Sequence, residues 1–319
     1  MYRDFDFSLL NDTIIHKTHW EWMWISLIFG ITAQLFRGLR WRQSLSPLGE
    51  NPRRSSCVYA IFISYASSLV IPRIGEVARC GVLTKYDGTN FTKAIGTVVT
   101  ERIIDTLLML VMALFTIFLQ IKVFASFFAE TGTTFSGLLH SFTTTGYIVS
   151  GICVLAIIIM AIVMRKRISA LTKINITIKN FKSGILSLKD VENKSLFTFY
   201  TLMIWVSYFI HYYLTFFCFD FTKDLGISAA LVSFVVGSIS VIVPTPTGAG
   251  PWHFSVKTIL MMYGLGMNDA VIFVLIVHTV QTALIPLLGL VGMIMLRKRY
   301  DLQTDTAAAR EDNERMQNI

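Results

Sequence analysis

Long apolar runs, separated by short polar or basic segments, dominate the pattern of this chain. Five runs are long enough to cross a hydrocarbon core of about 30 Å as single helices, at roughly 1.5 Å per residue. They cover residues 22–39, 94–120, 147–164, 196–219 and 270–296. The pattern therefore predicts an all-α integral membrane protein, built as a polytopic helical bundle.

Two more apolar segments are interrupted and cannot form continuous helices. Segment 57–85 breaks at Pro72 and Gly75. Proline removes an amide donor and clashes with the preceding turn, while glycine permits conformations that other residues disfavour. We predict two re-entrant helical hairpins, one opening from the cytoplasm and one from outside, with the broken backbone buried in protein or lining water. The second break, within 227–263, contains Pro244, Pro246, Gly248, Gly250 and Pro251.

The two halves of the chain repeat this order. Each half has a broken hairpin followed by a long span with polar groups in its first half. Paired interruptions in corresponding positions are typical of transporters with inverted repeats, whose sites lie where the half-helices meet. Simple kinks in two spanning helices are the alternative.

Composition supports the membrane assignment. Hydrophobic residues make up 54% of the 319 residues and charged residues 15%, and the mean hydropathy is +0.60. Soluble domains have about 25% charged residues. The formal net charge of +8 could indicate nucleic-acid binding, but the basic residues lie in short loops between apolar runs, so no nucleic-acid partner is expected. The cysteines and histidines show no metal-ligand or disulfide spacing, so no metal or other cofactor is expected.

The basic loops also predict the orientation. Loop 37–54 has five arginines and one acidic residue, and segments 165–194 and 297–299 are basic as well. The positive-inside rule places all three in the cytoplasm, which predicts a multi-pass protein of the cell (inner) membrane with a cytoplasmic C-terminus. Five crossings then leave the N-terminus outside, so we expect that a preceding span is missing from this chain. Residues 1–299 form the predicted membrane domain, and 300–319 a disordered cytoplasmic tail.

Ionisable residues in and beside segment 71–106 are the main candidates for a functional site. A charge at bilayer depth costs roughly 2.5–3.5 kcal/mol, so such residues usually pair and line a cavity. Thr97, Glu101 and Asp105 follow at intervals of four on one helix face, which requires a cation opposite, and we predict that Arg73 or Arg79 supplies it. The candidates in this segment are Arg73, Glu76, Arg79, Glu101, Arg102 and Asp105.

Other interpretations of these residues stay open. The charges could form a purely architectural clamp between the first hairpin and the next helix, and Arg79 and Lys85 could be anchors at the water interface. His211 lies near the middle of a predicted span, where it could serve function or be hydrogen-bonded at a helix contact.

Three motifs carry a resemblance to a known family. PRIGEVAR at 72–79, ERIIDTLLML at 101–110 and PTPTGAG at 244–250 resemble, in order and spacing, the lysylphosphatidylglycerol synthase transmembrane region, also called flippase-like membrane proteins. The resemblance extends from about residue 22 to residue 297. Family members usually begin with one more hydrophobic helix, in agreement with the missing span. The family's soluble aminoacyl-transferase domain is not recognised in this sequence, so lipid lysylation is not expected.

The resemblance implies a protein that moves lipids between leaflets. It also implies that the six ionisable candidates match the polar positions of the first family motifs, and that Pro244, Pro246, Gly248 and Gly250 match the proline–glycine motif. The chain departs from the family at Thr247, where a second glycine is usual, and at 251–253, where an acidic residue is usual. Thr247 and His253 therefore bear on the identity of the substrate.

Together, the residues and the resemblance predict translocation of an anionic or phosphate-bearing lipid, of phospholipid, aminoacyl-lipid or polyprenyl-phosphate type. Its headgroup would enter a polar cavity and bind Arg73, Arg79 or Arg102 beside half-helix N-termini, balanced by Glu101 and Asp105. One alternative is an intramembrane transferase that uses Glu101 or Asp105 with a histidine. Another is a scaffold that docks a cytoplasmic glycosyltransferase or lipid-modifying enzyme, and a homo-oligomer is compatible with each.

Overall fold

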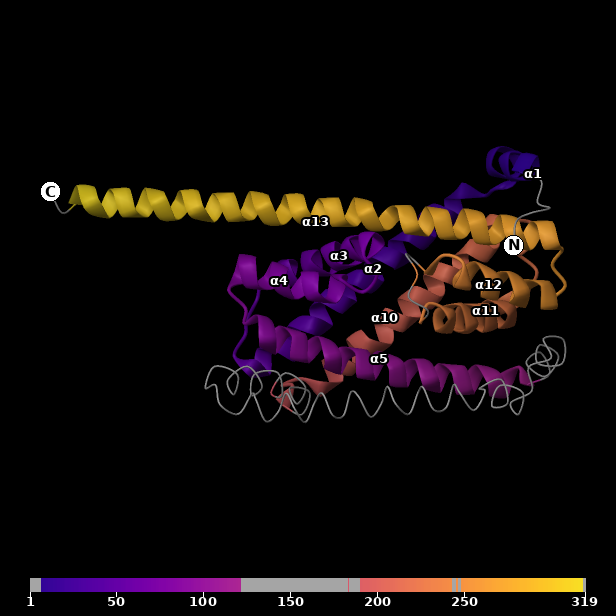
Figure 1. Cartoon of the computed structure of the whole chain (residues 1–319), viewed down its shortest axis with the longest axis horizontal. Coiled ribbons are helices and arrows are strands. Elements are labelled where there is room, and N and C mark those ends of the chain that lie inside the picture. The colour runs from indigo at the N-terminus through magenta and orange to yellow at the C-terminus, as the bar shows by residue number, and fades with distance from the viewer. Residues whose placement is uncertain (1–6, 122–182, 184–189, 243–244, 246–247, 318–319) are drawn as a thin grey trace, which may run out of the picture.

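The chain is a bundle of helices (Figure 1). The computed structural model describes residues 7–121, 183, 190–242, 245 and 248–317. Short turns of π-helix or 3-10 helix occur at Thr13–Lys17, Ser46–Leu48 and Thr215–Cys218. The α-helices are α1 (Phe7–Asp12), α2 (Trp20–Leu45), α3 (Arg54–Val70), α4 (Gly75–Asp87), α5 (Phe91–Leu119), α10 (Lys194–Leu214), α11 (Gly226–Ser240), α12 (Pro251–Met262) and α13 (Met267–Gln317). Within these ranges the structure has no strand, which confirms the all-α prediction.

Within the described residues, four helical segments are long and apolar enough to cross a membrane. They are Trp20–Leu48, Phe91–Leu119, Lys194–Cys218 and Met267–Asp301, and each contains or overlaps a predicted span. The fifth predicted span, 147–164, lies outside the described residues. Helix α13 continues to Gln317, through most of the segment for which the sequence predicts disorder. The orientation in the membrane stays a prediction.

Helix α2 extends further than the sequence predicts. Its arginines were expected to close the span near residue 39, at the water interface, but the helix continues to Leu45 with Arg37 and Arg40 buried. The reason is local pairing, because both guanidinium groups contact carboxylates of α5. A buried charge is tolerated where it is paired in this way.

The first predicted helix break is present between α3 and α4. Ile71, which precedes Pro72, has extended backbone (φ −128°, ψ 115°), as residues before proline usually do. Arg73 follows with φ +67°, in the left-handed region. The two helices then pack very closely, since a Cβ on Gly75 would lie 2.0 Å from the carbonyl oxygen of Ser64.

The second predicted break lies between α11 and α12, which also pack together. A Cβ on Gly237 of α11 would lie 2.9 Å from Val256 and 3.0 Å from Trp252, both on α12. Gly248 and Gly250 have φ of +76° and +88°, values that glycine adopts without strain. Both broken segments are therefore pairs of short packed helices, and their re-entrant position in a membrane stays a prediction.

The two halves pack against each other in a crossed manner. Helix α3 of the first pair lies on α13, α11 of the second pair contacts α5, and α2 pairs with α10. Small residues allow the close approach of α3 and α13, since a Cβ on Gly289 would lie 2.3 Å from the Cβ of Ala66. The tips of the two pairs also meet, because Nη2 of Arg73 donates to the carbonyl oxygen of Ile242 at 2.8 Å.

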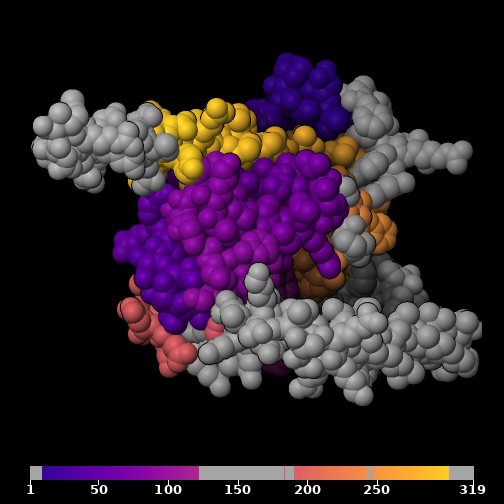
Figure 2. All heavy atoms as spheres, turned by 60° about the vertical axis from the view of Figure 1, so that its left-hand side comes forward, coloured from indigo at the N-terminus to yellow at the C-terminus, as the bar shows by residue number. Residues whose placement is uncertain are grey.

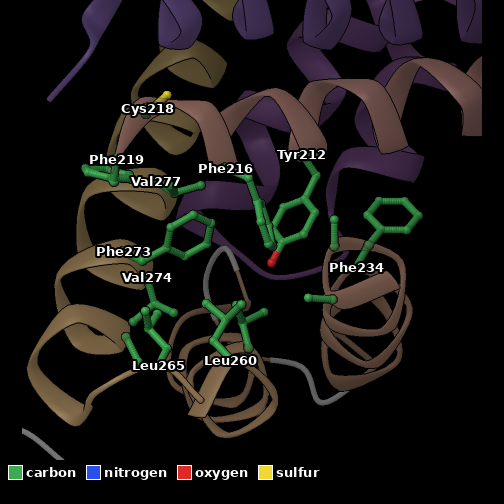
Figure 3. Close-up of a cluster of buried hydrophobic side chains, with 14 of the residues drawn as sticks. Tyr212, Phe216, Cys218, Phe219, Phe234, Leu260, Leu265, Phe273, Val274 and Val277 are labelled. Atoms are coloured by element: carbon green, nitrogen blue, oxygen red, sulfur yellow. The ribbon is translucent and has the colours of Figure 1, made fainter. Parts of the chain in front are cut away.

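Two apolar cores are present in the described residues, one lying mainly in each half. In the second half, aromatic side chains from four helices meet around Tyr212, with Phe216, Phe234 and Phe273 nearby (Figure 3). Tyr212 keeps its hydroxyl satisfied by donating to Ser233 at 3.0 Å. In the first half, a smaller core forms around Trp41, and α3, α4 and α5 make one continuous block beside α13 (Figure 2). These two cores fix the walls of the space between them.

Candidate functional site

A cavity of about 470 Å³ lies between the two halves of the bundle. Its walls come from α2, α3 and α5 of the first half and from α10, α11, α12 and α13 of the second. Val241 and Ile242, at the end of α11, also line it, beside the point where the two tips meet. The volume lies within the range of small-molecule sites, about 300–1,000 Å³.

One part of the cavity wall is a polar cluster that joins three helices. Nη1 of Arg37 donates to the hydroxyl of Tyr65 and, at 3.3 Å, to the hydroxyl of Tyr208. The two tyrosine oxygens lie 3.1 Å apart, and the amide of Gln34 donates to Tyr208 at 3.1 Å. The cluster therefore ties α2 to α3 of the first half and to α10 of the second.

Asp105 connects this cluster to a second arginine. Its Oδ2 lies 2.6 Å from Nη2 of Arg37, and its Oδ1 lies 2.7 Å from Nη1 of Arg40. Both oxygens of this buried carboxylate are thus paired with guanidinium groups. Asp105 and Arg37 line the cavity, whereas Arg40 lies behind them.

Glu101 forms the deeper layer of the same network. It lies 2.9 Å from Nη1 of Arg79 and 3.4 Å from Nε of Arg40. The Arg79 guanidinium also stacks over Trp41 at 4.5 Å, and the Trp41 indole donates to Thr97 at 3.0 Å. This confirms the predicted pairing of Arg79 with the acidic face of α5. These residues do not belong to the cavity wall, so they support it from behind.

Arg102 is the accessible arginine of the network. Its Nε lies 2.8 Å from Oε1 of Glu76, and both side chains are 41% exposed. Its other contact with the network is weaker, since Nη1 lies 3.9 Å from Oδ2 of Asp105. A half-exposed ion pair contributes little stability, so Arg102 can exchange Glu76 for another anion at a small cost. Arg102 also lines the cavity.

The network carries an excess of positive charge. Four guanidinium groups face three carboxylates, which leaves a net charge of +1. Unbalanced charge in a protected site favours a ligand of opposite sign. The four cations are Arg37, Arg40, Arg79 and Arg102, and the three anions are Glu76, Glu101 and Asp105.

The rest of the wall is mainly apolar and aromatic. Met109, Ile204 and Leu288 belong to it, together with Trp252 and several others. His211 lies both on this wall and at a helix contact, with Nδ1 2.6 Å from the carbonyl oxygen of Ser26. In the part of the chain that the structure describes, no three His, Cys, Asp or Glu side chains gather in a way that could hold a metal ion.

The remaining predicted site residues lie at or near the tips. Arg73 is exposed and bonds Ile242, so of the two arginines predicted as the balancing cation Arg79 is the one that contacts the acidic face of α5. Pro244, Pro246 and Thr247 lie outside the described residues. Gly248 and Gly250 follow them, and His253 lies on α12 with its ring centroid 4.5 Å from that of His278.

Sequence reasoning missed Arg37, Arg40, Tyr65 and Tyr208. The spacing of Arg37 and Arg40 by three places both on one helix face, which is a signal of a shared partner. The two tyrosines are typical of membrane-interface residues in sequence. Only the packing of α2 against α3 and α10 brings their hydroxyl groups together.

Comparison with known proteins adds one finding to this geometry. Neither the curated proteins nor the solved structures contain a match to the chain. Residues 1–289 match the family described as the lysylphosphatidylglycerol synthase TM region, which spans both halves of the bundle and every residue of the charged network. The chain therefore belongs to the lysylphosphatidylglycerol synthase transmembrane-region family, as its motifs predict, and is a multi-pass membrane protein tied to lipid handling.

Proposed function

We propose that this protein moves an anionic or phosphate-bearing lipid between the leaflets of its membrane. One observation supports this most: a single cavity between the two halves is lined by the accessible guanidinium group of Arg102, by the buried Arg37 and by an apolar wall. A lipid has the same two parts. Membership of a lipid-handling family agrees with this choice of ligand.

The headgroup would bind at the polar part of the wall. Guanidinium groups hold phosphate oxygens through paired, charge-assisted hydrogen bonds. Arg102 would make the first contact by exchanging Glu76 for the phosphate, and Arg37 lies on the same wall. Arg79 and Glu101 would act indirectly, because they hold Arg40 and the α5 backbone in place.

The acyl chains would remain outside the polar cluster. A cavity of about 470 Å³ holds a drug-sized group, which is the scale of a headgroup. Apolar residues of α5, α11 and α13 line the remainder and offer no hydrogen bonds that would oppose a hydrocarbon chain. Movement of the two helix pairs relative to each other would then present the headgroup to either leaflet, as in transporters with paired broken helices.

The geometry favours transport over the transferase alternative. General acid–base chemistry needs a carboxylate or imidazole within hydrogen-bond reach of the reacting group. Both oxygens of Asp105 are already paired with Arg37 and Arg40, and Glu101 lies behind the wall. Turnover of a labelled donor sugar by the purified protein would favour the transferase instead.

Reconstitution in liposomes tests the proposal. Purified protein is placed in phosphatidylcholine vesicles with a trace of tail-labelled fluorescent phosphatidylglycerol, and dithionite reports the arrival of inner-leaflet lipid outside. We expect Arg102→Ala to slow this movement by roughly tenfold or more, because a hydrogen bond to a charged group contributes about 1.5–3 kcal/mol. Arg102→Lys should retain part of the rate, since the charge remains without the planar fork.

Arg297→Ala is the matched control. Arg297 is an exposed arginine of α13, outside the cavity, and its loss should leave the rate unchanged. Equal rates for wild type and Arg102→Ala with several anionic lipids, or protein-independent rates, would contradict the proposal.

A further inference from the structure

A pair of histidines lies at the same cavity, with one member, His278, on its wall. The ring centroids of His253 on α12 and His278 on α13 are 4.5 Å apart, with the rings nearly perpendicular at 82°. Trp252 packs on His278 at 5.2 Å and so holds its ring against the wall. His278 lines the cavity together with Arg37 and Arg102. A proton on the pair would therefore lie at the same cavity as the headgroup.

The ionisable surroundings of the pair are sparse within the described parts of the chain. Helix α11 has no ionisable residue, and α12 adds Lys257, whose Nζ lies 3.8 Å from the sulfur of Met267. Helix α13 adds Asp269, nine residues before His278. From α10, Tyr212 contacts Trp252, and His211 lies on the cavity wall.

The one described carboxylate on the cavity wall is Asp105, and it is paired with Arg37 and Arg40. The acidic charge available to the cavity is thus already balanced by arginine. An anion that enters the cavity beside His278 favours a proton on the histidine pair.

We propose that the His253–His278 pair binds one proton together with the anionic headgroup, so that lipid and proton move together. This inference rests on the proposed function. Two imidazolium rings in contact would repel each other, so the pair takes up a single proton. An N–H bond forms on one imidazole nitrogen when the headgroup enters, and that proton returns to water on the side where the headgroup leaves.

Linkage makes the coupling reciprocal. The bound anion strengthens proton binding to the pair, and the proton strengthens anion binding by the same factor. A singly charged headgroup with one proton crosses the membrane without net charge. A pH gradient would then drive the lipid toward the less acidic side, because the headgroup binds where protons are abundant and leaves where they are scarce.

The test compares two pH values in the same liposomes. The probe is a trace of tail-labelled fluorescent phosphatidylglycerol in phosphatidylcholine vesicles. The trace amount does not saturate the site, so the rate of probe movement follows the affinity for the probe. At about pH 5.5 and about pH 7.5, on either side of the ordinary histidine pKa of about 6.5, we expect the wild-type rate to be roughly fivefold or more higher in acid. His278→Gln and, separately, the half-buried His253→Gln should abolish this ratio.

Two controls separate the possible outcomes. His19→Gln removes an exposed histidine paired with Glu21 and Asp220, and should keep the wild-type ratio. Arg102→Ala should lower the rate at both pH values. A wild-type rate that does not change with pH, or a ratio retained in both His→Gln variants that move lipid, overturns the proton coupling but leaves lipid movement standing. Absence of any protein-dependent movement of the probe overturns both proposals.

Discussion

Arg40 is the single residue on which the charged network depends most. It is fully buried and bridges Asp105 at 2.7 Å and Glu101 at 3.4 Å, so it is the only described cation in contact with both acids of α5. A fully buried arginine is stable only with its partners. Arg37 and Arg79 each balance one of the two acids. The same network thus holds the helices together and forms part of the cavity wall, so the architectural and the functional interpretation do not exclude each other.

Arg40→Ala should therefore lower stability strongly. Each acid of α5 keeps one guanidinium partner, but Asp105 loses a buried charged hydrogen bond, worth about 1.5–3 kcal/mol, and the missing side chain leaves a cavity that adds to the loss. Thermal or denaturant unfolding of the detergent-solubilised protein measures this loss. A second change, Asp105→Asn, should cost less stability in the Arg40→Ala variant than in the wild type, because the contact between the two residues is already lost. Additive losses in the double variant would show that the two residues do not interact.

Sequence could predict half of this network. The four-residue spacing of Thr97, Glu101 and Asp105 predicts that they share one helix face. The like charges of Glu101 and Asp105 require a cation, which Arg79 supplies. The contributions of Arg37 and Arg40 could not be predicted in the same way. A basic residue at the end of an apolar run has the same pattern whether it faces the cytoplasm or a carboxylate of another helix.

At the scale of elements, the helix pair α3–α4 shows how the sequence fixes close packing. Proline and glycine at the tip predict a break, and the break is found there. Their spacing does not predict how near the two helices come. Gly75 sets this distance, since its amide donates to Ser68 at 3.2 Å and its missing side chain leaves room for the carbonyl of Ser64.

Two glycines of the same helix make a matched comparison. Gly75→Ala places a methyl group 2.0 Å from the Ser64 oxygen, so it should destabilise the protein by roughly 1–3 kcal/mol or more. Gly81→Ala meets no atom within 4 Å and should be neutral or stabilising by up to about 1 kcal/mol, the helix-propensity difference. Thermal unfolding in detergent compares them. Equal effects of the two changes would show that α4 does not pack as described.

At the scale of the whole molecule, the chain joins two similar halves through crossed contacts. The sequence predicts the repeated order of a broken pair and a long helix. It does not predict that each pair packs on the long helix of the other half, because the contacts of α3 with α13 and α11 with α5 depend on tertiary packing. The cavity arises from this packing of each pair on the other half, since its walls belong to both halves.

The hydrogen bond from Arg73 to Ile242 links the tips of the two helix pairs. It joins residues 169 positions apart through one exposed side chain, outside both apolar cores. Arg73→Ala should remove this contact while both cores stay folded, and make separation of the two tips up to about fivefold more frequent, since an exposed charged contact contributes about 0.2–1 kcal/mol. With Ser238→Cys as a reporter on the cavity wall, an impermeant thiol reagent should then react faster. Lys85→Ala, on the same pair of helices, is the control and should leave the labelling rate unchanged. An unchanged labelling rate in Arg73→Ala would mean that the reagent enters the cavity elsewhere. The tips of the two helix pairs would thus separate by losing one water-accessible hydrogen bond, so that opening the cavity at this side would not require any helix to unfold.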